Sequence, residues 1–300
     1  MAISHLYGFP AIGRAGLGNA LFPWSRCYLW CKDQQVPMIG PFWTQFRLGP
    51  YLRREMDKRQ YQKLFSHHGY VSGWWRLICL ATSIKIEEEQ RDDALISVRG
   101  HRPAVVVFRG LNTYFEPLLD RHADLRAALW RITEPEYLSA NLPFTKFVGI
   151  HVRLGDFSKP NARSDPRRGH NGARLPLDWF VDVLTTLRAA LGYDVDALIC
   201  SDGALEELNE LLSMPRTMLY RGGSAITDLL ALAEASVLIA SGSTFSMWAS
   251  FLGQVPCVWF PSQRKQFLLE AGGQNLEPEL DYGEHLTANF IDAVAQRLVA

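Results

Sequence analysis

The chain has 300 residues, 48% hydrophobic and 21% charged, a balance typical of a soluble globular protein with room for two domains. Its 31 Lys and Arg residues equal its 31 Asp and Glu residues, which removes any global charge argument for nucleic-acid binding. No apolar run approaches the roughly 18 residues of a membrane span, and the first residues do not form a signal peptide, so we expect a cytoplasmic protein.

The N-terminal part of the chain is irregular. Residues 40–95 are basic and aromatic and allow no assignment, while the apolar runs 96–98 and 104–108 form either a hairpin or two separate strands. The remaining predicted elements are a strand at residues 5–8, a helix at about 19–35, a strand at 36–39 and a helix at 118–132.

Positive charge is concentrated in this part. Residues 1–76 hold ten Lys and Arg against three Asp and Glu, a net charge of +7, and much of it falls in the stretch 46–63. One interpretation is a solvated helix face. The other is a surface for an anionic acceptor or for anionic lipid head groups, which would place the protein peripherally at the inner face of a membrane.

The second half alternates strands with helices, which predicts an α/β fold with a parallel sheet and right-handed crossovers. Residues 133–142 form the predicted linker, so we expect one domain over residues 1–140 and a second over 141–300. The predicted strands are 146–152, 197–200, 217–220, 237–240 and 255–260, and the predicted helices are 175–191, 204–212, 227–235, 243–252 and 286–299.

Five cysteines show no spacing of a disulfide framework. Cys200 and Cys257 lie in apolar strand-like runs and are predicted to be buried thiols. Cys27 and Cys31 are four apart on one helix face, but no second Cys or His pair completes a metal site. A reducing compartment fits this use of cysteine.

The sequence FVGIHVRLGD at residues 147–156 joins a buried strand to a polar strand end. Strand alternation puts His151 and Arg153 on one side, Gly155 allows a sharp turn, and Asp156 returns a carboxylate. Ligands of open α/β sheets bind beyond the carboxyl ends of strands, and a guanidinium fork suits phosphate. The pattern predicts either a phosphate site with a candidate base or a structural Arg153–Asp156 ion pair at a turn.

Two further segments place a loop before a helix. The loop before the first helix contains Gly13, Gly16 and Gly18, whose spacing matches neither the dinucleotide-binding nor the Walker A motif. Two interpretations remain: the loop binds an anion, or it simply leads to Asn19 as the helix cap. Ser243 follows an apolar strand, and there the N–H groups either hold a phosphate or Ser243 only caps the helix.

Two further charged segments were considered as ligand-binding sites. Residues 163–174 contain four arginines after the Arg153 strand and form either a mobile loop over the site or a disordered one. Asp194-Val195-Asp196 matches the Asp-x-Asp of metal-dependent glycosyltransferases. It precedes its strand instead of following it, so we expect no metal there.

Three segments, in this order, resemble the fucosyltransferase superfamily, which includes α-1,6- and protein O-fucosyltransferases, and the bacterial-type α-1,2 family most closely. AGLGNA at residues 15–20 resembles the family's GGLGNQ, and HVRLGD at 151–156 resembles HVRRGD. Asp228-Leu229 followed by STFSMW at 243–248 resembles an Asp-Leu helix, an apolar strand and SSFSWW or STFSWW.

The resemblance implies a GT-B arrangement, in which two Rossmann-like domains with parallel sheets face each other across a cleft. It implies that the protein transfers a sugar from a GDP-sugar to a hydroxyl of a glycan acceptor, with inversion and without a metal. The expected donor is GDP-fucose. Such an acceptor fits surface polysaccharide or glycoconjugate synthesis and can be lipid-linked.

The resemblance also implies roles for individual residues. Arg153 would hold the β-phosphate, with Asp156 as the candidate base for the acceptor proton. The other implied donor contacts are His151 and Asp228 near the guanosine, Ser243, Thr244 and the Phe245 N–H at the diphosphate, and Gly18 and Asn19 facing the sugar or diphosphate.

Three positions depart from the family pattern: Ala20, Leu154 and Met247. They leave open a different GDP-hexose as donor, and they motivate a rival function as a non-catalytic sugar-nucleotide-binding or assembly protein of a polysaccharide pathway. A hydrolase or phosphatase on the same scaffold is a third interpretation. The sequence identifies neither the acceptor, nor the linkage, nor the oligomeric state.

Overall fold

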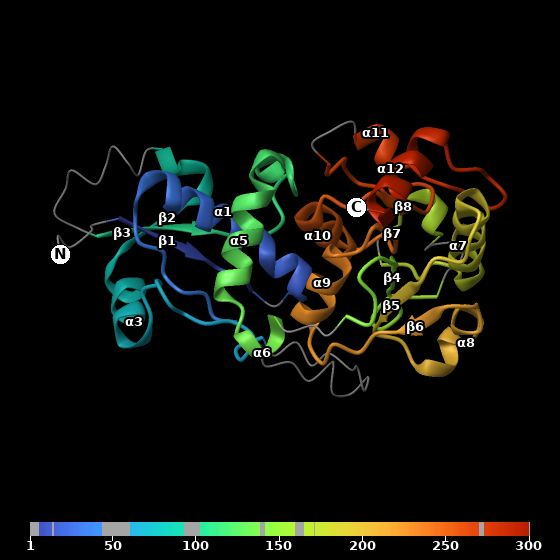
Figure 1. The fold of residues 1–300 in the computed structure, drawn as a ribbon. Coiled ribbons are helices and arrows are strands. Elements are labelled where there is room, and N and C mark those ends of the chain that lie inside the picture. Colours follow the sequence, from blue (N-terminus) through green and yellow to red (C-terminus); the bar gives the residue numbers. More distant parts are fainter. Residues whose placement is uncertain are drawn as a thin grey trace. The chain divides into compact units, whose positions relative to one another are not determined.

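The computed structural model describes residues 6–13, 15–43, 61–92, 103–138, 142–159, 165–170, 172–269 and 273–299. These residues form two compact units that divide after Glu134 (Figure 1). All but the last three residues of the basic stretch 46–63, the apolar run 96–98 and Arg163 lie outside the described residues.

The first unit is built on a parallel sheet with the strand order β1-β3-β2. Single-residue parallel bridges from Gly8 to Met38 and from Ile39 to Val71 continue the pairing beyond β1. Both neighbours of β3 are parallel to it, so the hairpin alternative for residues 104–108 is wrong. The strands are β1 (Leu6–Pro10), β2 (Ile84–Glu87) and β3 (Ala104–Phe108).

Helices cover both faces of this sheet. On one face, Gly8 of β1 lets α1 approach closely, because a Cβ at this position would collide with the sulfur of Cys31. On the other face, Tyr7 and Val105 pack with Cys79 of α3. The helices of this unit are α1 (Leu17–Gln34), α3 (Gly73–Thr82), η1 (Glu88–Gln90), η2 (Glu116–Arg121) and α5 (His122–Ile132).

The second unit holds a five-stranded parallel sheet in the order β6-β5-β4-β7-β8. The chain runs outward from the central β4 through β5 to β6, and then returns to β7 and β8 on the other side. All five residues of β4 are buried, as expected for a parallel strand with helices on both faces. The strands are β4 (Val148–Val152), β5 (Ala197–Ser201), β6 (Thr217–Leu219), β7 (Val237–Ala240) and β8 (Cys257–Trp259).

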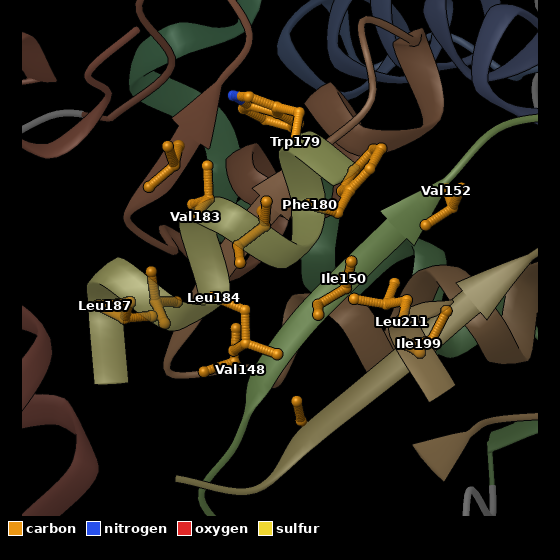
Figure 2. Packing of buried hydrophobic residues seen from close by; sticks show 14 of the residues in the cluster. Val148, Ile150, Val152, Trp179, Phe180, Val183, Leu184, Leu187, Ile199 and Leu211 are labelled. Carbon is orange, nitrogen blue, oxygen red and sulfur yellow. The ribbon is translucent and has the colours of Figure 1, made fainter. Parts of the chain in front are cut away.

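The apolar stripe of α7 forms the core on one face of this sheet. Figure 2 shows Phe180, Val183 and Leu184 of α7 beside Val148 and Ile150 of β4. The helices of this unit are α6 (Pro135–Leu138), η3 (Pro166–Arg168), α7 (Leu177–Leu191), η4 (Leu205–Leu208), α8 (Asn209–Leu212), α9 (Ala225–Ala233), α10 (Thr244–Gly253), α11 (Gly273–Leu276) and α12 (Ala288–Val299).

The predicted α/β class with parallel sheets is confirmed, and the facing of the two sheets across a cleft stays a prediction. The helix predicted at residues 204–212 is divided into η4 and α8. The predicted linker contains α6, which packs against α9 through a 3.2 Å hydrogen bond from Thr227 Oγ1 to the Tyr137 carbonyl. The unassigned stretch contains α3, whose apolar residues recur at helical spacing although sequence analysis assigned no helix there.

All five cysteines are unpaired and buried, which confirms the prediction for Cys200 and Cys257. Burial in apolar surroundings raises the pKa of both thiols. Within the described residues, no helix combines the length and apolarity that crossing a membrane requires.

Candidate functional site

The strand order of the second sheet reverses between β4 and β7, which makes the carboxyl edge there a topological switch point. The chain continues from β4 to one side of the sheet and from β7 to the other, so the two loops that follow these strands diverge. Such a switch point is where open α/β sheets bind ligands. Two of the three motif segments, residues 151–156 and 243–248, begin at or just beyond this edge.

Ser241 joins the two strand ends. Its hydroxyl donates to the His151 carbonyl at 2.5 Å and accepts from the Arg153 N–H at 2.9 Å, and its own N–H also donates to the His151 carbonyl. The backbone that carries His151 and Arg153 is therefore held by the chain that leads into α10.

His151 is buried against the start of α10. Its Nδ1 lies 2.7 Å from Ser246 Oγ, and its ring packs against Phe245 with 4.9 Å between centroids and a tilt of 30°. Burial lowers the pKa of His151 to about 4, opposed by Asp202 and assisted by Arg153. The imidazole is therefore neutral at pH 7 and can accept or donate one hydrogen bond at each nitrogen.

Arg153 lies between two carboxylates. One terminal nitrogen is 2.6 Å from Asp156 Oδ1, and the other is 2.7 Å from Asp202 Oδ2. The Arg153–Asp156 ion pair is therefore present, and the phosphate site stays a prediction. The three side chains carry a net charge of −1, and two of the five guanidinium N–H groups are engaged by the two contacts.

Asp202 is a site residue that sequence analysis did not select. Its Oδ1 accepts the N–H groups of Leu154 and Gly155 at 2.8 and 3.0 Å, while its Oδ2 binds Arg153. Gly155 is required there, because a Cβ would collide with the Asp202 carboxylate. The available signal was Ser201-Asp202-Gly203, a polar strand exit directly after β5.

The start of α10 combines a cap with a helix dipole. Ser243 Oγ accepts the Ser246 N–H at 3.3 Å and thus caps the helix, and phosphate binding by the neighbouring N–H groups stays a prediction. The first turn, with Thr244 and Phe245 partly exposed, presents the positive end of the helix dipole at the sheet edge. An anion in the crevice would be stabilised by this end.

The described part of the arginine-rich loop is fastened beside this start. Gln263 is buried and donates to the Pro166 carbonyl at 2.6 Å, and its side chain lies so close to Gly242 that a Cβ there would collide with it. Arg167 forms a two-bond ion pair with Asp281 at 2.6 and 2.8 Å. Residues 165–170 are therefore attached to the chain that follows β8.

Asp228 binds within its own loop. It lies in the first turn of α9, and its Oδ1 accepts the Gly222 N–H at 3.1 Å. Its negative charge and burial together raise the pKa of Tyr220 to about 12, with burial the larger cause. Asp228 thus shares the carboxyl edge with the Arg153 cluster, and its contact with a guanosine stays a prediction.

Gly18 and Asn19 lie in the first turn of α1, in the other unit. The N-cap of α1 is Gly16, so the alternative that Asn19 caps the helix is wrong. Asn19 is partly exposed, and its contact with a donor stays a prediction.

The three positions that depart from the family pattern are all buried. Ala20 lies inside α1, Met247 lies inside α10, and Leu154 belongs to the core of the second unit and contacts Gly203. These side chains act through packing in this chain, because burial leaves them little surface for a ligand.

Asp194 and Asp196 lie at the opposite, amino edge of the second sheet. Asp196 forms an ion pair with Arg216 at 2.6 Å, and Asp194 lies 3.9 Å from Arg188. Both carboxylates thus neutralise arginines that brace the start of β5.

No protein-family model matches the chain, and no curated protein sequence matches it. Among solved structures, it is similar to the NodZ α-1,6-fucosyltransferase soaked with GDP-fucose, with 15% identity, 86% of this chain and 97% of that chain covered, and a TM-score of 0.47. NodZ was solved from Bradyrhizobium.

It is also similar to an Arabidopsis thaliana FUT1 variant in complex with GDP (12% identity, 85% and 70% covered, TM-score 0.49). POFUT1 in complex with GDP is another similar structure (12% identity, 85% and 97% covered, TM-score 0.44). At these identities and TM-scores, the similarity transfers neither a ligand nor an activity to this chain.

Proposed function

We propose that this chain is a glycosyltransferase that takes a sugar from a GDP-sugar, with GDP-fucose as the expected donor, and transfers it to a hydroxyl of a glycan acceptor. The observation that carries the proposal is the hydrogen-bonded meeting of two motif segments at the switch point. His151 of one segment and Ser246 of the other are 95 residues apart in sequence, and Nδ1 of His151 lies 2.7 Å from Oγ of Ser246. One segment supplies an arginine and the other a helix start, the two groups that a diphosphate requires.

The proposed reaction is a single in-line displacement. The acceptor oxygen forms a bond to the anomeric carbon while the bond from that carbon to the diphosphate oxygen breaks, which inverts the centre. Arg153 and the α10 N-terminus stabilise the charge that develops on the diphosphate, so the reaction proceeds without a metal. The acceptor proton passes to Asp156.

The charge of the Arg153 cluster requires an exchange of partners when the donor binds. A diphosphate brings further negative charge to a cluster that is already net negative. Asp202 is 16% exposed and is also held to two backbone N–H groups, whereas Asp156 is 31% exposed. Asp156 is the carboxylate that turns from Arg153 to the acceptor, and this exchange gives it the position of a base.

The first unit completes the proposal. By the family resemblance, Gly18 and Asn19 at the start of α1 are the donor contacts proposed for the first unit, and His151 and Asp228 are the guanosine contacts proposed for the second. The acceptor is a surface polysaccharide or glycoconjugate precursor, which the protein meets in the cytoplasm at the membrane face.

The experiment that tests this function pairs Arg153→Ala with Arg216→Ala. Arg216 is also paired with an aspartate but lies at the amino edge of the same sheet, so it controls for the loss of one ion pair. We expect GDP, but not UDP, ADP or CMP, to raise the melting temperature of the wild type and of Arg216→Ala. Arg153→Ala loses this shift, and its transfer from GDP-fucose falls by about 10²–10³.

Near wild-type GDP binding and turnover in Arg153→Ala would remove the proposal. GDP binding without release of GDP from GDP-sugars would favour the non-catalytic binding protein instead. Rapid turnover of the donor without an acceptor would favour a hydrolase.

A further inference from the structure

Helix α3 of the first unit exposes a set of large apolar side chains. Trp74 is 82% exposed, Trp75 is 53% exposed, and Leu77 and Ile78 are each 45% exposed. The helix lies below the strands of the first unit in the view of Figure 1. Soluble proteins rarely expose apolar side chains in such a contiguous group without a function for the surface.

The helical positions place these side chains on one face. Trp74, Leu77, Ile78 and Ala81 follow the spacing of a single helix face, and Trp75 borders it. This α3 face carries no charged side chain, because Arg76 turns away from it. We define the α3 face as Trp74, Trp75, Leu77, Ile78 and Ala81.

Arg76 is occupied on the inner side of the helix. Its guanidinium lies 3.9 Å from the ring centre of Phe42, and one terminal nitrogen donates to the carbonyls of Gly40 and Pro41 at 3.3 Å. Cys79 supplies the contact with the sheet. The helix is thus fixed to the first unit, and its α3 face is left outward.

The segment of chain that carries the α3 face has a positive net charge. From Tyr61 to Ile86 the chain contains Lys63, Arg76 and Lys85 and no acidic residue, and both lysines are exposed. The basic stretch 46–63 leads into this segment in the sequence.

Acidic residues begin only at the far end of β2, and they are engaged there. Glu87 pairs with Arg109 at 3.3 Å, and Glu88 is buried against Arg26. They therefore do not neutralise the lysines by direct pairing.

We propose that the α3 face rests on the surface of an anionic lipid bilayer, with Trp74 and Trp75 at the level of the head groups. Tryptophan is enriched at that level, because its ring is apolar and its N–H stays hydrated. Lys63 and Lys85 add attraction to anionic head groups. This surface is distinct from the donor site and is proposed independently of the donor.

A second copy of the chain fits this surface less well. A two-fold contact places the same patch against itself, which brings the exposed lysines of the two copies together. The segment from Tyr61 to Ile86 offers no carboxylate to neutralise them.

The test measures co-sedimentation of the full chain with vesicles of phosphatidylcholine and phosphatidylglycerol in equal amounts, and with vesicles of phosphatidylcholine alone. The double variant Trp74→Ser, Trp75→Ser is compared with the control Tyr193→Ser, Leu205→Ser, which removes two exposed apolar side chains from the second unit. We expect the wild type and the control to bind the anionic vesicles, and to bind them more weakly at high salt. We expect the tryptophan variant to bind these vesicles with an affinity at least about tenfold lower than that of the wild type.

Unchanged melting temperatures and unchanged stabilisation by GDP in both variants show that the fold and the donor site are intact. If GDP does not raise the melting temperature of the wild type, the proposed function is contradicted, but the vesicle result still holds. Equal vesicle binding by the tryptophan variant and the wild type, or no binding by the wild type, overturns the inference. A dimer in light scattering that the tryptophan variant abolishes assigns the face to a second copy and also overturns it.

Discussion

Arg153 shows how much of the site depends on single contacts. Its two carboxylate partners come from different places: Asp156 from its own turn and Asp202 from the loop after the neighbouring strand β5. The pairing of Arg153 with Asp156 could be predicted from the sequence, as one of the two interpretations of residues 151–156. The second could not, because 49 residues separate the strand end of Val152 from that of Ser201 and only the sheet register brings β4 and β5 together.

The variants Asp156→Asn and Asp202→Asn separate a base from a residue that orients Arg153. Removing the charge of Asp156 lowers the repulsion of a diphosphate, so we expect GDP to bind up to about tenfold more tightly to Asp156→Asn. If Asp156 takes the acceptor proton, turnover falls by about 10²–10⁴ in the same variant. Calorimetry with GDP and steady-state kinetics measure the two effects.

Asp202→Asn is the matched control, because the asparagine Oδ1 can still accept the N–H groups of Leu154 and Gly155. We expect the turnover of Asp202→Asn to change only in proportion to any change in its GDP affinity. Weakened GDP binding in Asp156→Asn, with turnover reduced in proportion, would show that Asp156 orients Arg153 and is not the base.

Helix α10 contributes to the site as an element. Its first turn is fixed by Ser243 as cap and by the contacts of Ser246 and Phe245 with His151. A helix start that is held in this way keeps its N–H groups and its dipole directed at one point, which is the requirement for binding an anion without a metal.

The variant Ser243→Ala tests this role. Loss of the cap lowers the free energy of unfolding by about 1 kcal/mol, and fraying of the first turn weakens GDP binding. The control is Thr287→Ala, which removes the side-chain acceptor of the Phe290 N–H at the start of α12. We expect similar losses of stability in urea unfolding, with GDP affinity reduced only in Ser243→Ala. Equal GDP affinity in the two variants would contradict the role of α10.

At the scale of the whole molecule, the second unit contains two buried titratable groups whose effects on stability oppose each other. Burial lowers the pKa of His151 to about 4 and raises the pKa of Glu277 to about 7. Glu277 accepts the N–H groups of Leu268 and Leu269 at 2.8 and 3.2 Å, and so ties the segment after β8 to the residue that follows α11.

The sign of each contribution follows from proton binding in the two states. Between pH 4 and 6.5 the unfolded chain protonates His151 more than the folded chain does, so stability falls as the pH falls through this range. Between pH 4.5 and 7 the folded chain holds the Glu277 proton more tightly, so stability falls as the pH rises through this range. Each contribution is about 3 kcal/mol, and the two largely cancel.

Single variants remove the cancellation. We expect His151→Gln to become more stable, relative to the wild type, as the pH falls from 7 to 5, and Glu277→Gln to become relatively less stable. Urea unfolding of the three proteins at several pH values measures this. Parallel pH profiles for the wild type and both variants would contradict the two shifted pKa values.

The sequence by itself determined the α/β class, the strand–helix order of the second unit and the motif residues at two strand ends. These features depend on local periods and on residues close together in the chain. Helix α3 was missed although its apolar residues recur at helical spacing, because the basic and aromatic stretch 40–95 around it allowed no assignment.

Only the tertiary structure decided which strand ends meet. It placed β4 between β5 and β7, and thereby brought Asp202 and Ser241 to the two sides of the segment from His151 to Arg153. It also assigned Leu154 to the core and Trp74 to the surface. The physical reason is that pairing between strands and the burial of a side chain are set by contacts between distant parts of the chain, which the local pattern of residues does not contain.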